Sequence, residues 1–278
     1  MKYSVHAGLW MAQWTDPVEP IVARVAELGF DGVEVSMLDM TDEAADALGR
    51  AVRASGIELT LSDGLSPAAD ITSADGARRQ AGIDYLRWAV RTAARAGARG
   101  IAGVLYAPWG VFDPDNKPAR AARAAEALAA LAPDLERHDV TLGLEAINRF
   151  ETDLVNTAAE AAALARAAGT ARVGVLLDSF HLNIEEKDIR AAIAGAADRL
   201  VHFHVSDNDR GVPGAGHLPW DQVRAGLADA GYDGWICAEM FVTAGNPSSR
   251  DLNIWRDIEP DADDAARRAL GFMRERFG

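Results

Sequence analysis

Val173-Gly174-Val175-Leu176-Leu177-Asp178, residues 173–178, is a short apolar run that ends in a carboxylate. A run of this length and composition is typical of a strand. Three further strand-like segments carry an acid or an imidazole near their ends, within Leu144-Glu145-Ala146, Phe203-His204-Val205 and Ala238-Glu239-Met240. Three carboxylates and one imidazole at the ends of successive strands are a donor set suited to one divalent cation.

Strand-like and helix-like segments alternate along the whole chain. Eight short apolar or β-branched runs are each followed by a stretch of helical length rich in Ala, Arg and Glu. The predicted strands are residues 3–8, 32–35, 58–61, 100–104, 141–145, 173–178, 200–206 and 234–239. Examples of the predicted helices are residues 17–28, 77–96, 118–137 and 263–276.

This alternation predicts an α/β fold, a (β/α)8 TIM barrel whose active site lies at the carboxyl ends of the strands. Gly29 and Gly231 support the boundaries, because each follows a predicted helix at the turn into the next strand. A doubly wound open sheet is the alternative, but the first strand lacks the Gly-rich phosphate turn of dinucleotide-binding folds. We expect a single TIM barrel over residues 1–278, because no Pro/Ser-rich linker divides the chain.

Composition and charge exclude several classes of protein. Apolar residues make up 49% of the chain and charged residues 25%, which is the balance of a globular protein with an ample core. The formal net charge of −14 disfavours binding to nucleic acid and to anionic membranes. No apolar stretch approaches the length of about 18 residues that a membrane span needs. With a single cysteine, Cys237, no internal disulfide can form, and we expect a cytoplasmic protein.

The four strand-terminal residues Glu145, Asp178, His204 and Glu239 are the predicted metal ligands. Taken singly, each could instead cap a helix or pair with a surface arginine. Together, four ionisable groups at the rim of one closed barrel would leave uncompensated charge unless a cation neutralised it. Mn2+ is the favoured ion, with Co2+ or Mg2+ as alternatives, because three of the four ligands are carboxylates.

Side-chain parity distinguishes the two histidines of the seventh strand. His202 and His204 lie two residues apart and therefore share one face, which we expect to point into the barrel. Since His204 is nearer the carboxyl end, it is the predicted ligand, and His202 is interpreted as a hydrogen-bonded core histidine.

Three polar residues follow the predicted ligands at short spacing, and we expect them in the loops above the metal. Glu151 lies six residues after Glu145, His181 three after Asp178 and Arg210 six after His204. Arg210 could clamp a substrate oxygen, or it could form a surface ion pair with Asp207 or Asp209. His181 could alternatively be a helix-start residue without a role.

Glycine and aromatic residues near the strand ends allow further interpretations. The segment of residues 210–217 is rich in glycine and follows the seventh strand, where barrels often bind phosphate. Because it lacks a basic cluster, we interpret it as a shaped loop. Five aromatic residues could either wall a sugar-sized pocket or form a dimer contact: Trp10, Trp14, Tyr106, Trp109 and Phe241.

The motifs around these residues resemble those of the D-tagatose/D-psicose (allulose) 3-epimerases, within the xylose-isomerase-like sugar isomerase and epimerase barrels. Residues 145–151, EAINRFE, are similar to the family stretch E-x-x-N-R-F-E, and residues 177–186, LDSFHLNIEE, to L-D-T-F-H-M-N-I-E-E. The H-F-H motif of residues 202–204 and the segment of residues 214–221, GAGHLPWD, also correspond. The likeness covers nearly the whole chain and is most specific in its second half.

Carried over position by position, the resemblance implies the same four metal ligands and assigns substrate positioning to Glu151, His181 and Arg210. We also expect His6, Trp14 and Trp109, which lie near strand ends, to contribute to substrate binding. His6 departs from the family, which commonly has an aromatic residue there, and the segment of residues 104–109 also differs in detail. These departures leave the preferred sugar open.

The resemblance implies a ketose 3-epimerase that acts on a free ketohexose or ketopentose. Inversion at C3 needs two acid/base groups that flank the carbon, and Glu145 and Glu239 could meet this need. The main alternative is an isomerase that moves a carbonyl between C1 and C2, acting on an aldose-ketose pair or a hydroxypyruvate-type substrate. The resemblance also implies a homodimer or homotetramer, in which the segment of residues 241–255 is either a contact or a lid.

Two other classes of function agree less well with the sequence. A metal-dependent DNA-repair endonuclease would need several Zn2+ ions, more histidines and a basic face, which the net charge argues against. A barrel that binds sugar without catalysis would show ligand binding but no proton exchange.

Overall fold

The computed structural model describes residues 1–278 and contains eight parallel strands that form one closed barrel in sequence order. Strand β8 pairs with β1 and completes the ring. The strands are β1 (Lys2–His6), β2 (Gly32–Ser36), β3 (Glu58–Leu65), β4 (Gly100–Pro108), β5 (Thr141–Glu145), β6 (Val173–Asp178), β7 (Leu200–Val205) and β8 (Trp235–Ala238). The predicted (β/α)8 TIM barrel is therefore confirmed.

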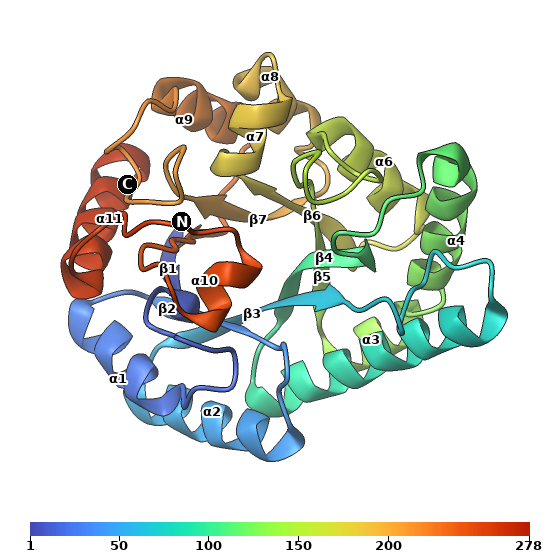
Figure 1. Cartoon of the computed structure of the whole chain (residues 1–278), viewed down its shortest axis with the longest axis horizontal. Helices are drawn as coiled ribbons and strands as arrows, with labels where there is room; N and C mark the ends of the chain where they lie inside the picture. The colour runs from blue at the N-terminus through green and yellow to red at the C-terminus, as the bar shows by residue number, and fades with distance from the viewer.

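Helices surround the barrel, as Figure 1 shows. Eleven α-helices are present: α1 (Glu19–Leu28), α2 (Asp42–Ser55), α3 (Gly76–Ala96), α4 (Lys117–Ala129), α5 (Ala132–His138), α6 (Ala158–Ala167), α7 (Ser179–Glu185), α8 (Ile189–Gly195), α9 (Trp220–Asp229), α10 (Pro247–Asp251) and α11 (Ala262–Phe277). Two short 3-10 helices are η1 (Ala7–Leu9) and η2 (Pro114–Asn116). A continuous core of 73 buried apolar residues joins the barrel to this outer ring. None of the helices has the length and hydrophobicity needed to cross a bilayer.

Strands β3 and β4 each extend four residues beyond their predicted ends, and two further boundaries are wrong for local reasons. The helix expected over residues 118–137 is divided into α4 and α5, with Pro133 in the first turn of α5. Proline has no N–H to donate to the preceding turn, and its ring crowds the carbonyl four residues back, so a new helix starts there. Strand β1 ends at His6 rather than Gly8, because the chain enters η1 at Ala7.

The segment between β8 and α11 covers part of the carboxyl end of the barrel. Helix α10 lies in front of the strands in Figure 1, and Asp251 at its end lines the cavity described below. The indole Nε1 of Trp14, in the loop after β1, donates a hydrogen bond of 2.9 Å to Oδ2 of Asp251. This contact joins the first βα loop to the last one at the carboxyl end of the barrel, where β1 and β8 are neighbours.

Strand β4 approaches β3 so closely that Gly103 has no room for a side chain. Its φ is +128°, and an added Cβ would lie 2.2 Å from the carbonyl oxygen of Asp63. Gly103→Ala is therefore expected to lower the free energy of unfolding by about 3 kcal/mol, from backbone strain and steric overlap together. Urea denaturation monitored by circular dichroism measures the change.

Gly56→Ala is the control, because Gly56 also has a positive φ, +70°, but an added Cβ there would meet nothing within 4 Å. It is expected to cost only about 1 kcal/mol. An equal loss of unfolding free energy in the two variants would show that the close contact with β3 adds nothing to the cost of the substitution.

Candidate active site

The four predicted metal ligands converge at the carboxyl ends of consecutive strands. Glu145 and Asp178 are the last residues of β5 and β6, His204 lies near the end of β7, and Glu239 directly follows β8. Asp178 and His204 are partners in the β6–β7 register. One donor atom from each of the four side chains lies within 4.8 Å of all the others. The structure thus brings together the set chosen from the sequence.

Burial makes this cluster electrostatically costly. Desolvation, together with the charge of Glu239, raises the pKa of Glu145 well above its usual value. Burial alone would also raise the pKa of Glu239, but the neighbouring charges of His204 and Arg210 hold it far below the usual range. Carboxylates crowded in this way are stabilised by additional positive charge.

Arg210 supplies part of that charge. Its Nη1 donates to Oδ2 of Asp178 at 2.6 Å and to Oε2 of Glu239 at 2.8 Å. The guanidinium stacks on Phe180 with its Cζ 4.1 Å from the ring centroid, and Arg210 adopts a left-handed backbone with φ +67°. The alternative surface ion pair is wrong, since Arg210 is buried and turned into the site. A strained non-glycine backbone at such a position is common in functional sites.

The donor set fits a divalent cation. The Nδ1 of His204 is buried and makes no hydrogen bond, although Oε2 of Glu239 lies only 3.4 Å away. An uncommitted imidazole nitrogen among three carboxylates can coordinate an ion without first losing a protein partner. The structure therefore contains a buried cluster of potential ligands consistent with a divalent metal site.

Glu151 and His181 lie beside this cluster. Oε2 of Glu151 accepts a hydrogen bond of 3.0 Å from Nε1 of Trp109. Nε2 of His181 lies 3.1 Å from Nη2 of Arg210, and burial with the adjacent Arg210 charge lowers the pKa of His181 to about 3. His181 is thus a neutral ring at physiological pH. It belongs to helix α7 rather than to a loop, because α7 starts directly after β6.

A cavity of about 420 Å³ opens above the cluster, a volume in the range of small-molecule sites. All the predicted site residues line it except Asp178, which is fully buried beneath. His6, Trp14 and Phe241 meet edge to face on one side, with ring centroids 5.7–6.4 Å apart.

Two of the five aromatic residues considered for the pocket wall are elsewhere. Tyr106 is fully buried, with its hydroxyl 3.4 Å from the carbonyl oxygen of Val155. The indole of Trp10 donates to Asp263 at the start of α11. Both rings therefore serve the packing of the barrel and not its opening.

Glu34 is a buried site residue that the sequence analysis did not single out. It lies in β2 with no exposed surface, 2.7 Å from a ring nitrogen of both His202 and His204. This places both histidines inside the barrel, as parity predicted, and makes His202 a paired core residue. The available signal was a single charged residue between Val33 and Val35 in a predicted strand.

Asp63, near the end of β3, is a second buried acid at the cavity. Its oxygens accept hydrogen bonds of 2.9 and 3.0 Å from the hydroxyl of Tyr85, and Oδ1 accepts from the backbone N–H of Gly64. Desolvation outweighs these contacts and raises the pKa of Asp63 to about 7. The folded protein therefore holds this proton at pH values where the unfolded chain has released it.

The contribution of Asp63 to stability is full below pH 4 and is lost as the pH rises to about 7. Asp63→Asn, which mimics the protonated form, is expected to remove this dependence. Between pH 5 and pH 8, the free energy of unfolding of the wild type should fall relative to that of the variant by roughly 2–4 kcal/mol. Urea titrations at both pH values measure the difference, and parallel pH profiles would contradict the assignment.

Comparison with known proteins agrees with this geometry. The family model of the xylose isomerase-like TIM barrel matches residues 22–276. D-psicose 3-epimerase from Agrobacterium fabrum is 34% identical to the chain, over 99% of the chain and 98% of the relative. The chain belongs to the ketose 3-epimerases of the xylose isomerase-like TIM barrel family. The resemblance seen in the sequence motifs is thereby confirmed.

Other members of the family are similarly close. L-ribulose 3-epimerase from Mesorhizobium japonicum is 32% identical, over 98% of the chain and 93% of the relative. A crystal structure of D-psicose 3-epimerase in the presence of D-fructose superposes with a TM-score of 0.95 at 33% identity and covers all of both chains. The expected enzyme class, an isomerase that epimerises carbohydrates, is confirmed.

Proposed function

We propose that this epimerase inverts C3 of a free ketohexose or ketopentose and depends on one divalent cation per chain. The observation that carries the proposal is the convergence of donor atoms from Glu145, Asp178, His204 and Glu239 within 4.8 Å at the mouth of the barrel. The names of the relatives, which include D-psicose and L-ribulose 3-epimerases, support the substrate class.

Glu145, Asp178, His204 and Glu239 would hold the cation. Mn2+ suits three carboxylates and one imidazole best, and Co2+ or Mg2+ could take its place. A bound cation supplies Lewis acidity that stabilises negative charge developing on the oxygens of the substrate.

Glu145 and Glu239 are the proposed acid/base pair. The C3 proton of a ketose is acidic because the C2 carbonyl is adjacent, and its removal gives an enediolate. Inversion needs one group to remove the proton from one face and a second group to return a proton on the other. Glu145, the last residue of β5, and Glu239, which directly follows β8, both line the cavity, so their carboxylates can flank a carbon in this way.

Arg210, His181 and Glu151 are the proposed positioning groups for the O1 and O2 end of the sugar. Arg210 is held by Asp178, Glu239 and the Phe180 ring, so it enters the reaction already oriented. His181, neutral and buried, can exchange hydrogen bonds with a hydroxyl without adding charge. Such preorganisation keeps the reacting carbon between the two carboxylates.

His6, Trp14 and Trp109 are proposed to bind the remainder of the sugar. Nδ1 of His6 accepts from the backbone N–H of Gly8, so the Nε2 proton is directed to Oγ of Ser62 at 2.9 Å. Ser62 lines the cavity and can donate its own proton to a sugar oxygen. An unphosphorylated substrate is favoured, since Arg210 is the one Lys or Arg side chain at the cavity and already pairs with two carboxylates.

The proposal is tested with metal-stripped protein reconstituted with Mn2+, Co2+ or Mg2+ and assayed on a panel of ketohexoses and ketopentoses. Each active substrate is expected to yield its C3 epimer and no aldose. An aldose as the main product would favour the alternative, an isomerase acting between C1 and C2. A cytoplasmic location and a homodimeric or homotetrameric state are further expectations, which fractionation and light scattering test.

A further inference from the structure

A carboxylate deep inside the barrel, that of Glu34, contacts the predicted ligand His204 at Nε2, the ring nitrogen that does not face Glu239, although Glu34 itself has an oxygen within 4.8 Å of a Glu239 oxygen. Oε1 of Glu34 lies 2.7 Å from Nε2 of His204, and Oε2 lies 2.7 Å from Nε2 of His202. The hydroxyl of Thr60 donates to Oε2 at 3.0 Å. Glu34 on β2 therefore contacts two histidines of β7 across the interior of the barrel, one with each carboxylate oxygen.

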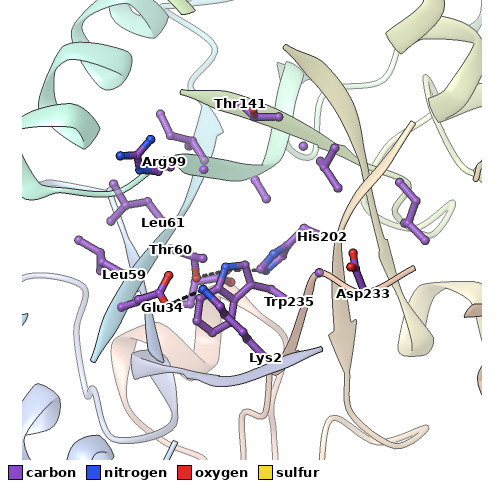
Figure 2. Close-up of a pocket in the computed structure, with 18 of the residues that line it drawn as sticks. Lys2, Glu34, Leu59, Thr60, Leu61, Arg99, Thr141, His202, Asp233 and Trp235 are labelled. Carbon is purple, nitrogen blue, oxygen red and sulfur yellow. Dashed lines mark hydrogen bonds and ion pairs between the residues drawn. The ribbon is translucent and has the colours of Figure 1, made fainter. Parts of the chain in front are cut away.

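Close packing does not account for the position of the Glu34 carboxylate. A cavity of about 990 Å³ extends from the amino-terminal mouth of the barrel to Glu34, Thr60 and His202. Figure 2 shows these three side chains gathered at one side of that space. A buried charge is retained only where its partners compensate its desolvation, so its position depends on the histidines and Thr60.

The two ring nitrogens of His204 face different groups. Nδ1 lies 3.4 Å from Oε2 of Glu239 and Nε2 lies 2.7 Å from Oε1 of Glu34, and the angles at both nitrogens fall short of a regular hydrogen bond. A neutral imidazole that donates its Nε2 proton to a carboxylate presents a lone pair at Nδ1. Such a partner fixes both the tautomer and the ring plane of a metal-binding histidine.

We propose that Glu34 is a positioning residue that orients His204 and selects the tautomer with its Nδ1 lone pair directed at the cation. His202 and Thr60 hold Glu34 in place and do not touch the ion. The proposal rests on the proposed metal dependence. It differs from a second ion site at Glu34, His202, His204 and Cys237, whose donor atoms also lie within 4.8 Å of one another.

The test compares Glu34→Gln with Glu58→Gln in the absence of sugar. Both changes remove one negative charge at the same cavity, but Glu58 lies at the exposed mouth, paired with Lys2. Isothermal titration with Mn2+ is expected to give one ion per wild-type chain. Glu34→Gln should weaken its binding by about 10- to 100-fold, and Glu58→Gln by less than about 2-fold.

Pulsed electron paramagnetic resonance of the Mn2+-loaded proteins reports the geometry directly. The ¹⁴N coupling from His204 is expected in the wild type and should change in Glu34→Gln, which a general loss of stability would not cause. If Glu34→Gln fails to fold, the ¹⁵N resonances of the Mg2+-loaded wild type show which ring nitrogen of His204 carries the proton. The proton is expected on Nε2.

Three results would overturn the inference: unchanged affinity and coupling in Glu34→Gln, a proton on Nδ1, or a second ion whose binding requires Glu34. Wild-type protein that takes up no cation would contradict the proposed function as well. The two failures are therefore distinguishable.

Discussion

Glu239→Gln is expected to lower kcat for C3 epimerisation by about 10³-fold, and Glu145→Gln by a similar factor. Glutamine keeps the shape of each side chain but cannot accept or return a proton. The neighbouring His204 and Arg210 hold the pKa of Glu239 low, which suits it to be an ionised base. Initial rates at saturating Mn2+ measure the effect.

The controls for these variants separate chemistry from metal loading. Mn2+ content is measured for each variant, and rates are compared only where the site is filled. Glu136→Gln is the matched control, because Glu136 is an exposed acid on α5 outside the cavity. A rate within about 10-fold of the wild type in either active-site variant would remove that residue from the acid/base pair.

Removal of the cation by chelation is expected to reduce activity to the background, and added Mn2+ should restore it. Without the ion, three carboxylates are crowded together with only Arg210 to compensate their charge. Their mutual repulsion destabilises the fold. A ligand present at 100 times its Kd stabilises a folded protein by about 2.7 kcal/mol. For a chain of this size the corresponding rise in Tm on Mn2+ addition is roughly 5–10 °C.

Calcium at equal concentration is the control for this experiment, because Ca2+ prefers more oxygen ligands and longer bonds than this cluster offers. It should restore little activity. Full activity after verified metal removal would contradict the proposed role of the cluster.

Much of the fold was predictable because parallel strands and helices carry different periodicities. The alternation of apolar runs with Ala-rich stretches fixed the number of βα units, and the strand-terminal acids then had to meet at one rim. Glu145, Asp178 and Glu239 were found for this reason. The break between α4 and α5 was missed, although Pro133 marks it.

Other features depend on contacts between distant strands. Glu34 and His204 are 170 residues apart in the chain and are joined only by closure of the barrel. The sequence pattern also does not predict the direction in which side chains in loops point. Trp10 and Trp14 are four residues apart, yet the first packs against α11 and the second reaches α10.

Epimerisation in D2O shows whether the enzyme removes a proton from C3 and returns one. A ketohexose incubated with the Mn2+-loaded enzyme is followed by ¹H NMR until substrate and epimer equilibrate. Deuterium is expected at C3 of the epimer, with none at C1 and no aldose. Deuterium at C1 with an aldose product, or an epimer that keeps its C3 proton throughout, would contradict proton transfer at C3.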